Sequence, residues 1–242
     1  MSSVLHRRAL RRHVKVAVVA LAAMAALSAC SLDGFSGSEP AAAATTPTPT
    51  PTPTFDSQFT RDGTFQSHVD IDGVDFVYNM YPTKATPRTN EWYPLGAKYF
   101  SFTFGAYDLD QDLRDPFKTK RKVYLDRIEV ESATKATSGT VQTPYTLNEK
   151  AETITFDPEP VTSKYGMLIT SPKGAFELRN QAIGDLAADT QGLTLTFRAT
   201  VRIQRSAGSK SYSTETIRQE VPIAIFASDT PTVAAQIPVD AG

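Results

Sequence analysis

Stretches in which apolar and polar residues alternate one by one constrain the fold of this 242-residue chain more than any other feature. The sequence "KYFSFTFGAY" places Phe100, Phe102 and Phe104 on one side of an extended backbone, with small polar residues between them. The stretch "GLTLTFRATVRIQ", residues 192–204, alternates in the same way. Successive side chains of a strand point to opposite faces, so a period of two predicts strands with one buried face.

Similar patterns and turn signals extend this prediction over residues 59–229. Asp72-Gly73 is the pair that type I′ hairpin turns prefer, and "SAGSKS", residues 206–211, is typical of a second hairpin loop. Pro222 suits the edge of a sheet or a bulge. Further strands are expected over residues 64–71, 74–81, 122–132 (with a bulge between Leu125 and Ile128), 152–156, 165–170 and 215–226. With residues 179–192 as the one short helix, the sequence predicts an all-β, antiparallel β-sandwich.

The first 29 residues have a different composition. "MSSVLHRRALRRHVK" contains five bases and no acid, and residues 16–29 form an unbroken run of apolar and small residues. This pattern is typical of a secretory signal peptide, and the run is shorter than the roughly 20 residues that a spanning helix needs. The paired arginines leave two export routes open, general secretion and the twin-arginine route.

The one cysteine of the chain, Cys30, follows this segment directly. The residues "LSAC", Leu27 to Cys30, resemble the bacterial lipobox at all four positions. The resemblance implies cleavage before Cys30 and attachment of diacylglycerol, with palmitate-like acyl chains, to its thiol. Two acyl chains anchor a protein stably, so we expect it on the extracytoplasmic face of the cell membrane.

A tether is expected over residues 30–58. It contains "TTPTPTPTPT", which favours polyproline II and would extend about 31 Å over ten residues. Whether its threonines carry sugars is left open. Residues 230–242 are expected to form a flexible C-terminal tail.

Removal of the signal peptide leaves 20 Lys and Arg against 26 Asp and Glu. This acidic balance argues against a nucleic-acid partner, which requires a surplus of bases. One histidine, His68, remains beside the acylated cysteine, so no cofactor and no zinc or iron site are expected. The sequence "DLDQDLRD" makes Asp108, Asp110 and Asp112 weak candidates for calcium ligands, although the glycine of an EF-hand loop is missing.

The sequence contains no recognisable set of catalytic residues. His68 lies on a predicted strand without a nucleophile motif near it, and "SATK" at Ser132 lacks the companion motifs of serine-lysine enzymes. We therefore expect a protein that is not an enzyme. Lys118, Lys120, Arg121 and Lys122 form a basic segment that is interpreted as a solvated loop, with anionic lipid headgroups or wall polymers as the alternative contacts.

Aromatic residues outside the strongest strands are the candidate partner-binding residues: Trp92, Tyr93, Tyr78 and Tyr81. For Trp92 the equal alternative is that it covers the end of the sandwich core. The sequences "GAKYFSFTFGAYDLD" and "LAADTQGLTLTF" resemble immunoglobulin-like domains of bacterial lipoproteins, over roughly residues 64–226. The resemblance implies an immunoglobulin-like fold more than a function. Two functions are expected: a lipid-anchored protein that binds a protein partner or supports an envelope complex, or a carrier of a small or lipidic ligand.

Overall fold

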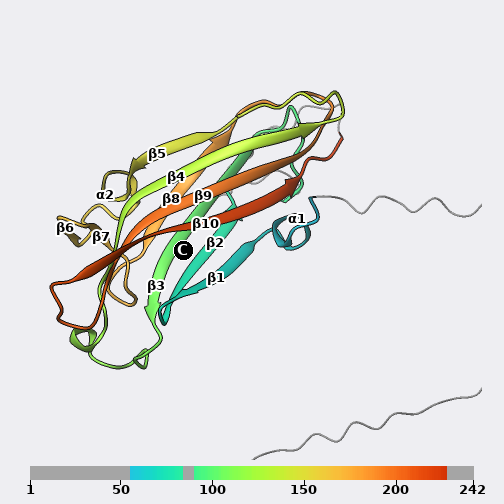
Figure 1. Cartoon of the computed structure of the whole chain (residues 1–242). Helices are drawn as coiled ribbons and strands as arrows, with labels where there is room; N and C mark the ends of the chain where they lie inside the picture. The colour runs from blue at the N-terminus through green and yellow to red at the C-terminus, as the bar shows by residue number, and fades with distance from the viewer. Residues whose placement is uncertain (1–54, 84–89, 228–242) are drawn as a thin grey trace, which may run out of the picture. The chain divides into compact units, whose positions relative to one another are not determined.

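The computed structural model describes residues 55–83 and 90–227, which lie in one compact unit, Pro49–Gly242 (Figure 1). The expected signal peptide, Cys30, the tether up to residue 54 and the tail from residue 230 lie outside the described residues. Among the described residues, no helix is long and apolar enough to cross a membrane.

Two antiparallel sheets pack face to face, which confirms the predicted β-sandwich. The elements are α1 (Gln58–Asp62), β1 (Phe65–Ile71), β2 (Val74–Pro82), β3 (Lys98–Asp108), the 3-10 turn η1 (Phe117–Thr119), β4 (Val123–Ala136), β5 (Thr146–Lys150), α2 (Ala151–Ile154), β6 (Thr162–Ser163), β7 (Gly166–Leu168), β8 (Phe176–Ile183), β9 (Thr190–Gln204) and β10 (Tyr212–Ala224). One sheet has the order β1-β2-β3-β8. The other has the order β10-β9-β4-β7-β6, with β5 also paired to β4.

Aromatic side chains from both sheets fill the space between them. Phe102 of β3 meets Phe197 of β9 edge to face, with ring centroids 5.0 Å apart, and Tyr78 of β2 lies 5.4 Å from the same ring. All three are essentially inaccessible to solvent. The period-two pattern of the sequence therefore produces this core, since every second residue of each strand points into it.

The predicted turns form where the sequence indicated them. Asp72 and Gly73 both have positive φ, 52° and 73°, as a type I′ turn between β1 and β2 requires. The second hairpin pairs Gln204 with Tyr212, and the register of β4 against β9 shifts between Leu125 and Arg127, at the predicted bulge.

Two local predictions are wrong. Residues 179–192 are not a helix: they complete β8, form the connection 184–189 and begin β9, because pairing of β8 with β3 overrides a weak helical pattern. Residues 152–156 are not a strand, because most of them form the single turn α2. Ala151 and Ile154, three residues apart, both pack against the core, and a helical turn brings residues of this spacing to one side.

The packed domain begins before residue 59, its expected boundary. Phe55 is buried, and its ring lies over Gly192 so closely that a Cβ there would be 2.2 Å from it. Ser57 caps α1 by accepting a hydrogen bond from the Thr60 amide. The chain therefore joins the sandwich at the Gly192 end of β9.

Candidate functional site

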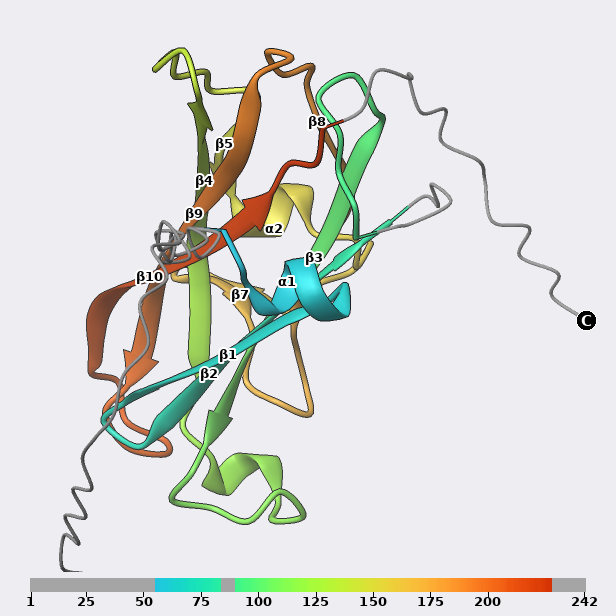
Figure 2. The same cartoon turned by 90° about the vertical axis from the view of Figure 1, so that its right-hand side faces the viewer.

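An open pocket of about 580 Å³ lies at the opposite end of β9. Three connections that are distant in sequence form it: residues 109–122 between β3 and β4, the β6–β7 turn and the β9–β10 hairpin. Figures 1 and 2 show the first and last of these at the same end of the sandwich. The lining residues are Lys118, Lys120, Lys122, Lys164, Tyr165, Gln204, Gly208, Ser209, Lys210 and Tyr212. We call this site the lysine–tyrosine pocket.

The charge of the pocket is entirely positive. Five of its ten lining residues are lysines, and none is Asp or Glu. Four of the lysines are exposed, whereas Lys120 is buried and donates a hydrogen bond to the backbone oxygen of Asp112. Within the described part of the chain, none of the five forms an ion pair with a carboxylate. The pocket thus presents positive charge without a carboxylate in its lining, which favours negatively charged ligands.

One wall of the pocket is aromatic. The rings of Tyr165 and Tyr212 have centroids 4.4 Å apart, and Tyr124 packs behind both of them. The Lys164 ammonium lies 5.0 Å from the Tyr165 ring centroid, within the range of a cation–π contact. Burial, followed by the proximity of Tyr124 and Tyr165, raises the pKa of Tyr212. Its hydroxyl therefore remains a hydrogen-bond donor at neutral pH.

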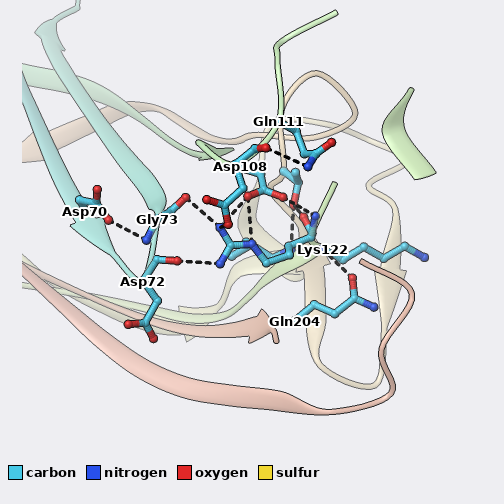
Figure 3. Close-up of polar contacts among 11 residues, drawn as sticks. Asp70, Asp72, Gly73, Asp108, Gln111, Lys122 and Gln204 are labelled. Carbon is cyan, nitrogen blue, oxygen red and sulfur yellow. Dashed lines mark hydrogen bonds and ion pairs between the residues drawn. The ribbon is translucent and has the colours of Figure 1, made fainter. Parts of the chain in front are cut away.

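Arg121 holds the lysine-bearing connection in place from the side opposite the pocket. Its guanidinium donates to Asp108 Oδ1 through Nε at 2.9 Å and Nη2 at 2.6 Å, and to the carbonyl oxygens of Asp72 and Gly73 at 2.7 and 2.8 Å. Figure 3 shows these acceptors gathered on one side, while the Lys122 side chain extends away from them. Adjacent residues of an extended backbone thus serve two purposes: Arg121 braces the β1–β2 turn, and Lys122 faces the pocket.

Two buried polar side chains fix the neighbouring backbone. Gln204 accepts a hydrogen bond from the Lys122 amide at 3.0 Å and donates one to the Ser209 carbonyl at 2.6 Å, and so joins the start of β4 to the hairpin loop. Thr170 accepts from the Val123 amide at 2.7 Å and donates to the Arg121 carbonyl at 3.2 Å. Because these groups are buried and satisfied, they hold the pocket rigidly.

The candidate partner-binding aromatics are not brought together on a surface. Trp92 and Tyr78 are core residues, 2% and 1% exposed. Trp92 packs edge to face against Phe59 at 5.1 Å. Tyr93 and Tyr81 are half-buried, and their hydroxyls donate to Glu91 and Glu177 respectively. Burial therefore withdraws Trp92 and Tyr78 from the surface, and Tyr93 and Tyr81 are the two candidates that solvent still reaches.

Two of the three weak calcium candidates, Asp108 and Asp110, contact Arg121 instead. The Asp108 carboxylate accepts three hydrogen bonds from Arg121, including one from its amide at 2.7 Å, and Asp110 lies 3.0 Å from the same guanidinium. Burial by itself would raise the pKa of Asp108, but the hydrogen bonds from Arg121 outweigh it and lower this pKa. Residues 55–83 and 90–227 contain no cluster of three or more His, Cys, Asp or Glu side chains suited to a metal ion.

The two residues considered for catalysis have other partners. His68 is exposed on β1, and its Nδ1 lies 2.8 Å from Asp75 Oδ2. Ser132 is buried within β4, where its hydroxyl donates to the Tyr145 carbonyl and accepts from the Tyr145 amide. Ser132 Oγ is thus occupied by backbone contacts rather than directed at Lys135.

The sequence indicated part of the pocket. Lys118, Lys120 and Lys122 stood out as a basic segment, but interpreting it as a solvated loop overlooked its partners. Lys164, Tyr165, Lys210 and Tyr212 carry no local motif, because only the pairing of strands brings them to this end. The "SAGSKS" hairpin was the one usable signal for Lys210 and Tyr212.

Comparisons with known proteins give no further indication. No protein-family model matches the chain, and no curated protein matches it. The function must therefore be inferred from the residues themselves.

Proposed function

We propose that this chain is a lipid-anchored, extracytoplasmic binding protein without enzymatic activity, and that the lysine–tyrosine pocket is its binding site for an anionic partner. The observation that supports this proposal best is the set of five lysines around one pocket with no acidic lining residue. Such a pocket attracts anions over distances of about 8–10 Å at physiological ionic strength.

The proposal assigns the pocket to binding rather than to chemistry because of the groups that line it. They are ammonium groups, tyrosine hydroxyls, one amide and one serine, with no carboxylate or imidazole to act as a general base. The anchor part rests on the lipobox resemblance at Cys30 and on the signal peptide pattern before it. The partner is an envelope component, either a protein or another molecule that carries negative groups.

The carrier of a small or lipidic ligand between the sheets is the second hypothesis. It calls for a large apolar cavity, whereas aromatic rings from both sheets meet across the middle of this sandwich. The geometry gives this hypothesis less support than the surface pocket.

A pull-down from mild-detergent membranes tests the proposal. The intact lipoprotein is compared with a K122Q/K164Q/K210Q variant and with a K135Q/K150Q/K173Q variant, which removes three exposed lysines outside the pocket. We expect a stoichiometric envelope component with the parent and the second variant, and its loss with the first. Equal recovery with all three proteins would contradict the role of the pocket. An unmodified peptide running through Cys30 in the mass spectra would contradict the anchor.

A further inference from the structure

We infer that the lysine–tyrosine pocket binds a cyclic polyol or sugar that carries several phosphate groups. This inference rests on the proposed function and names the chemistry of the ligand. It combines the type of charged group, the aromatic wall, the size of the pocket and its position in the domain.

The cations of the pocket suit phosphate groups. No arginine lines the pocket, and Arg121, which lies between Lys120 and Lys122 in the chain, is turned inward to Asp108. An ammonium is a point charge with three donors, which binds the tetrahedral phosphate group without the planar, two-bond geometry of a guanidinium. The four exposed lysines exceed what one phosphate needs, so a ligand with several phosphates fits the pocket best.

The aromatic wall favours a ring. The rings of Tyr165 and Tyr212 pack against each other, with centroids 4.4 Å apart and planes tilted by 37°, and Tyr124 behind them keeps their side chains in place. A flat ring face packs against the C–H face of a saturated ring, while a tyrosine hydroxyl reaches a polar substituent. The pocket volume of about 580 Å³ lies within the range of roughly 300–1,000 Å³ that small-molecule sites occupy. A flat protein interface would not need this shape.

The position of the pocket favours a soluble or polymer-borne phosphate over a lipid headgroup of the anchoring membrane. The chain enters the domain where Phe55 packs on Gly192, and the pocket lies beside Gln204. These two positions are separated by twelve residues of β9, about 40 Å of extended strand. Since the expected anchor precedes Phe55, the pocket lies at the end remote from the point of attachment.

Calorimetric titration tests the inference. The intact acylated chain is held in neutral phosphatidylcholine nanodiscs at physiological salt, and the probes are inositol hexakisphosphate, tripolyphosphate and inorganic phosphate. We expect one saturable site for inositol hexakisphosphate, with weaker binding of tripolyphosphate and weakest binding of inorganic phosphate. The K122Q/K164Q/K210Q variant should lose affinity by about 30-fold or more, since each charged hydrogen bond contributes severalfold. The K135Q/K150Q/K173Q control should change it by less than about threefold.

A third variant, Tyr165→Leu, isolates the ring contact. It should lower the affinity for inositol hexakisphosphate about fivefold and leave the affinity for tripolyphosphate unchanged, because only inositol hexakisphosphate has a ring that packs against a tyrosine. Thermal melts of all variants serve as the control that each substitution leaves the fold intact.

Three results would overturn the inference. Equal losses in the two lysine variants would show a general charge effect, and absence of saturable binding would show that the pocket takes no polyphosphate. Pocket-dependent pelleting of the nanodisc-held protein by phosphatidylglycerol vesicles would identify a lipid headgroup as the ligand. If the pull-down still recovers an envelope protein through the pocket lysines, the proposed function stands while this inference fails.

Discussion

At the scale of single residues, the buried Asp108–Arg121 pair determines whether the lysine-bearing connection keeps its shape. Their side chains are 2% and 9% exposed, so replacement of one partner leaves the other charged and buried. We expect Asp108→Asn to lower the free energy of unfolding by about 3 kcal/mol. Urea denaturation measures this loss. Asp110→Asn, at a side chain 70% exposed that contacts the same guanidinium, should cost less than about 1 kcal/mol.

The same pair makes the free energy of unfolding depend on pH in the acidic range. Arg121 holds the pKa of Asp108 below its ordinary value of 3.8, so the unfolded chain binds a proton more readily than the folded one. The contribution of the Asp108–Arg121 pair to the free energy of unfolding is therefore complete above pH 3.8. It is lost as the pH falls through the pKa that Asp108 has in the folded protein. Denaturation curves measured below pH 4 should show that the free energy of unfolding falls more steeply with decreasing pH for the parent than for Asp108→Asn. Parallel pH profiles would show that the pair does not titrate as described.

Substitution of Gly166 measures how closely the chain beside Tyr165, in the pocket wall, packs against β4. It follows Tyr165, has φ of 105°, and a Cβ there would lie 2.2 Å from the Leu125 carbonyl oxygen. Gly166→Ala should therefore cost about 3 kcal/mol, since backbone strain and steric overlap combine. Gly139→Ala is the matched control, because Gly139 also has positive φ but nothing within 4 Å, and about 1 kcal/mol is expected. Equal losses would show that the backbone at Gly166 moves away freely.

At the scale of elements, the last three residues of the 13-residue edge strand β10 offer no free outward N–H group to another chain. The amide of Ala224 points away from β9 and donates to Thr60 Oγ1 of α1. Pro222, two residues earlier, has its nitrogen on the same side and lacks a donor. Edges without such protection pair readily with other strands.

Pro222→Thr should therefore promote self-association with little change in unfolding free energy. The substitution adds an outward N–H and favours strand structure, so a concentration-dependent dimer is expected in light scattering after size exclusion. Ser213→Thr is the control, since it adds a β-branched residue to β10 without adding a donor. A strictly monomeric Pro222→Thr variant would show that this edge is blocked by other means.

The sequence predicted the strands whose buried faces are continuous, and missed elements that depend on distant partners. β3, β4 and β9 were evident because apolar residues alternate along them. β5 and β8 were missed since much of each faces solvent and pairing with β4 or β3 specifies them. For the same reason three of the five pocket lysines, which adjoin β4, were recognisable as a basic segment, whereas Lys164 and Lys210 were not. Trp92 and Tyr78 remained candidates for partner binding because the sequence alone does not show which aromatic side chains the core buries.

At the scale of the whole molecule, the length of β9 separates the point where the chain enters the domain from the lysine–tyrosine pocket. α1 contacts β10 at Ala224, which pairs with Gly192, whereas the pocket surrounds Gln204 and Tyr212 at the other end of the same hairpin. The pocket is therefore at the end of this hairpin opposite to the point where the chain enters the domain.

Fluorescence energy transfer measures this separation. An acylated Cys30 leaves no other thiol in the chain, so a cysteine introduced at Asp62 or at Ser206, both exposed, is labelled uniquely. With an acceptor lipid in the anchoring bilayer, the dye at position 206 should transfer less energy than the dye at position 62. The two sites differ by about the length of β9, near 40 Å. Equal transfer from both positions would mean that the domain lies flat on the bilayer, where the pocket lysines would reach lipid phosphates directly.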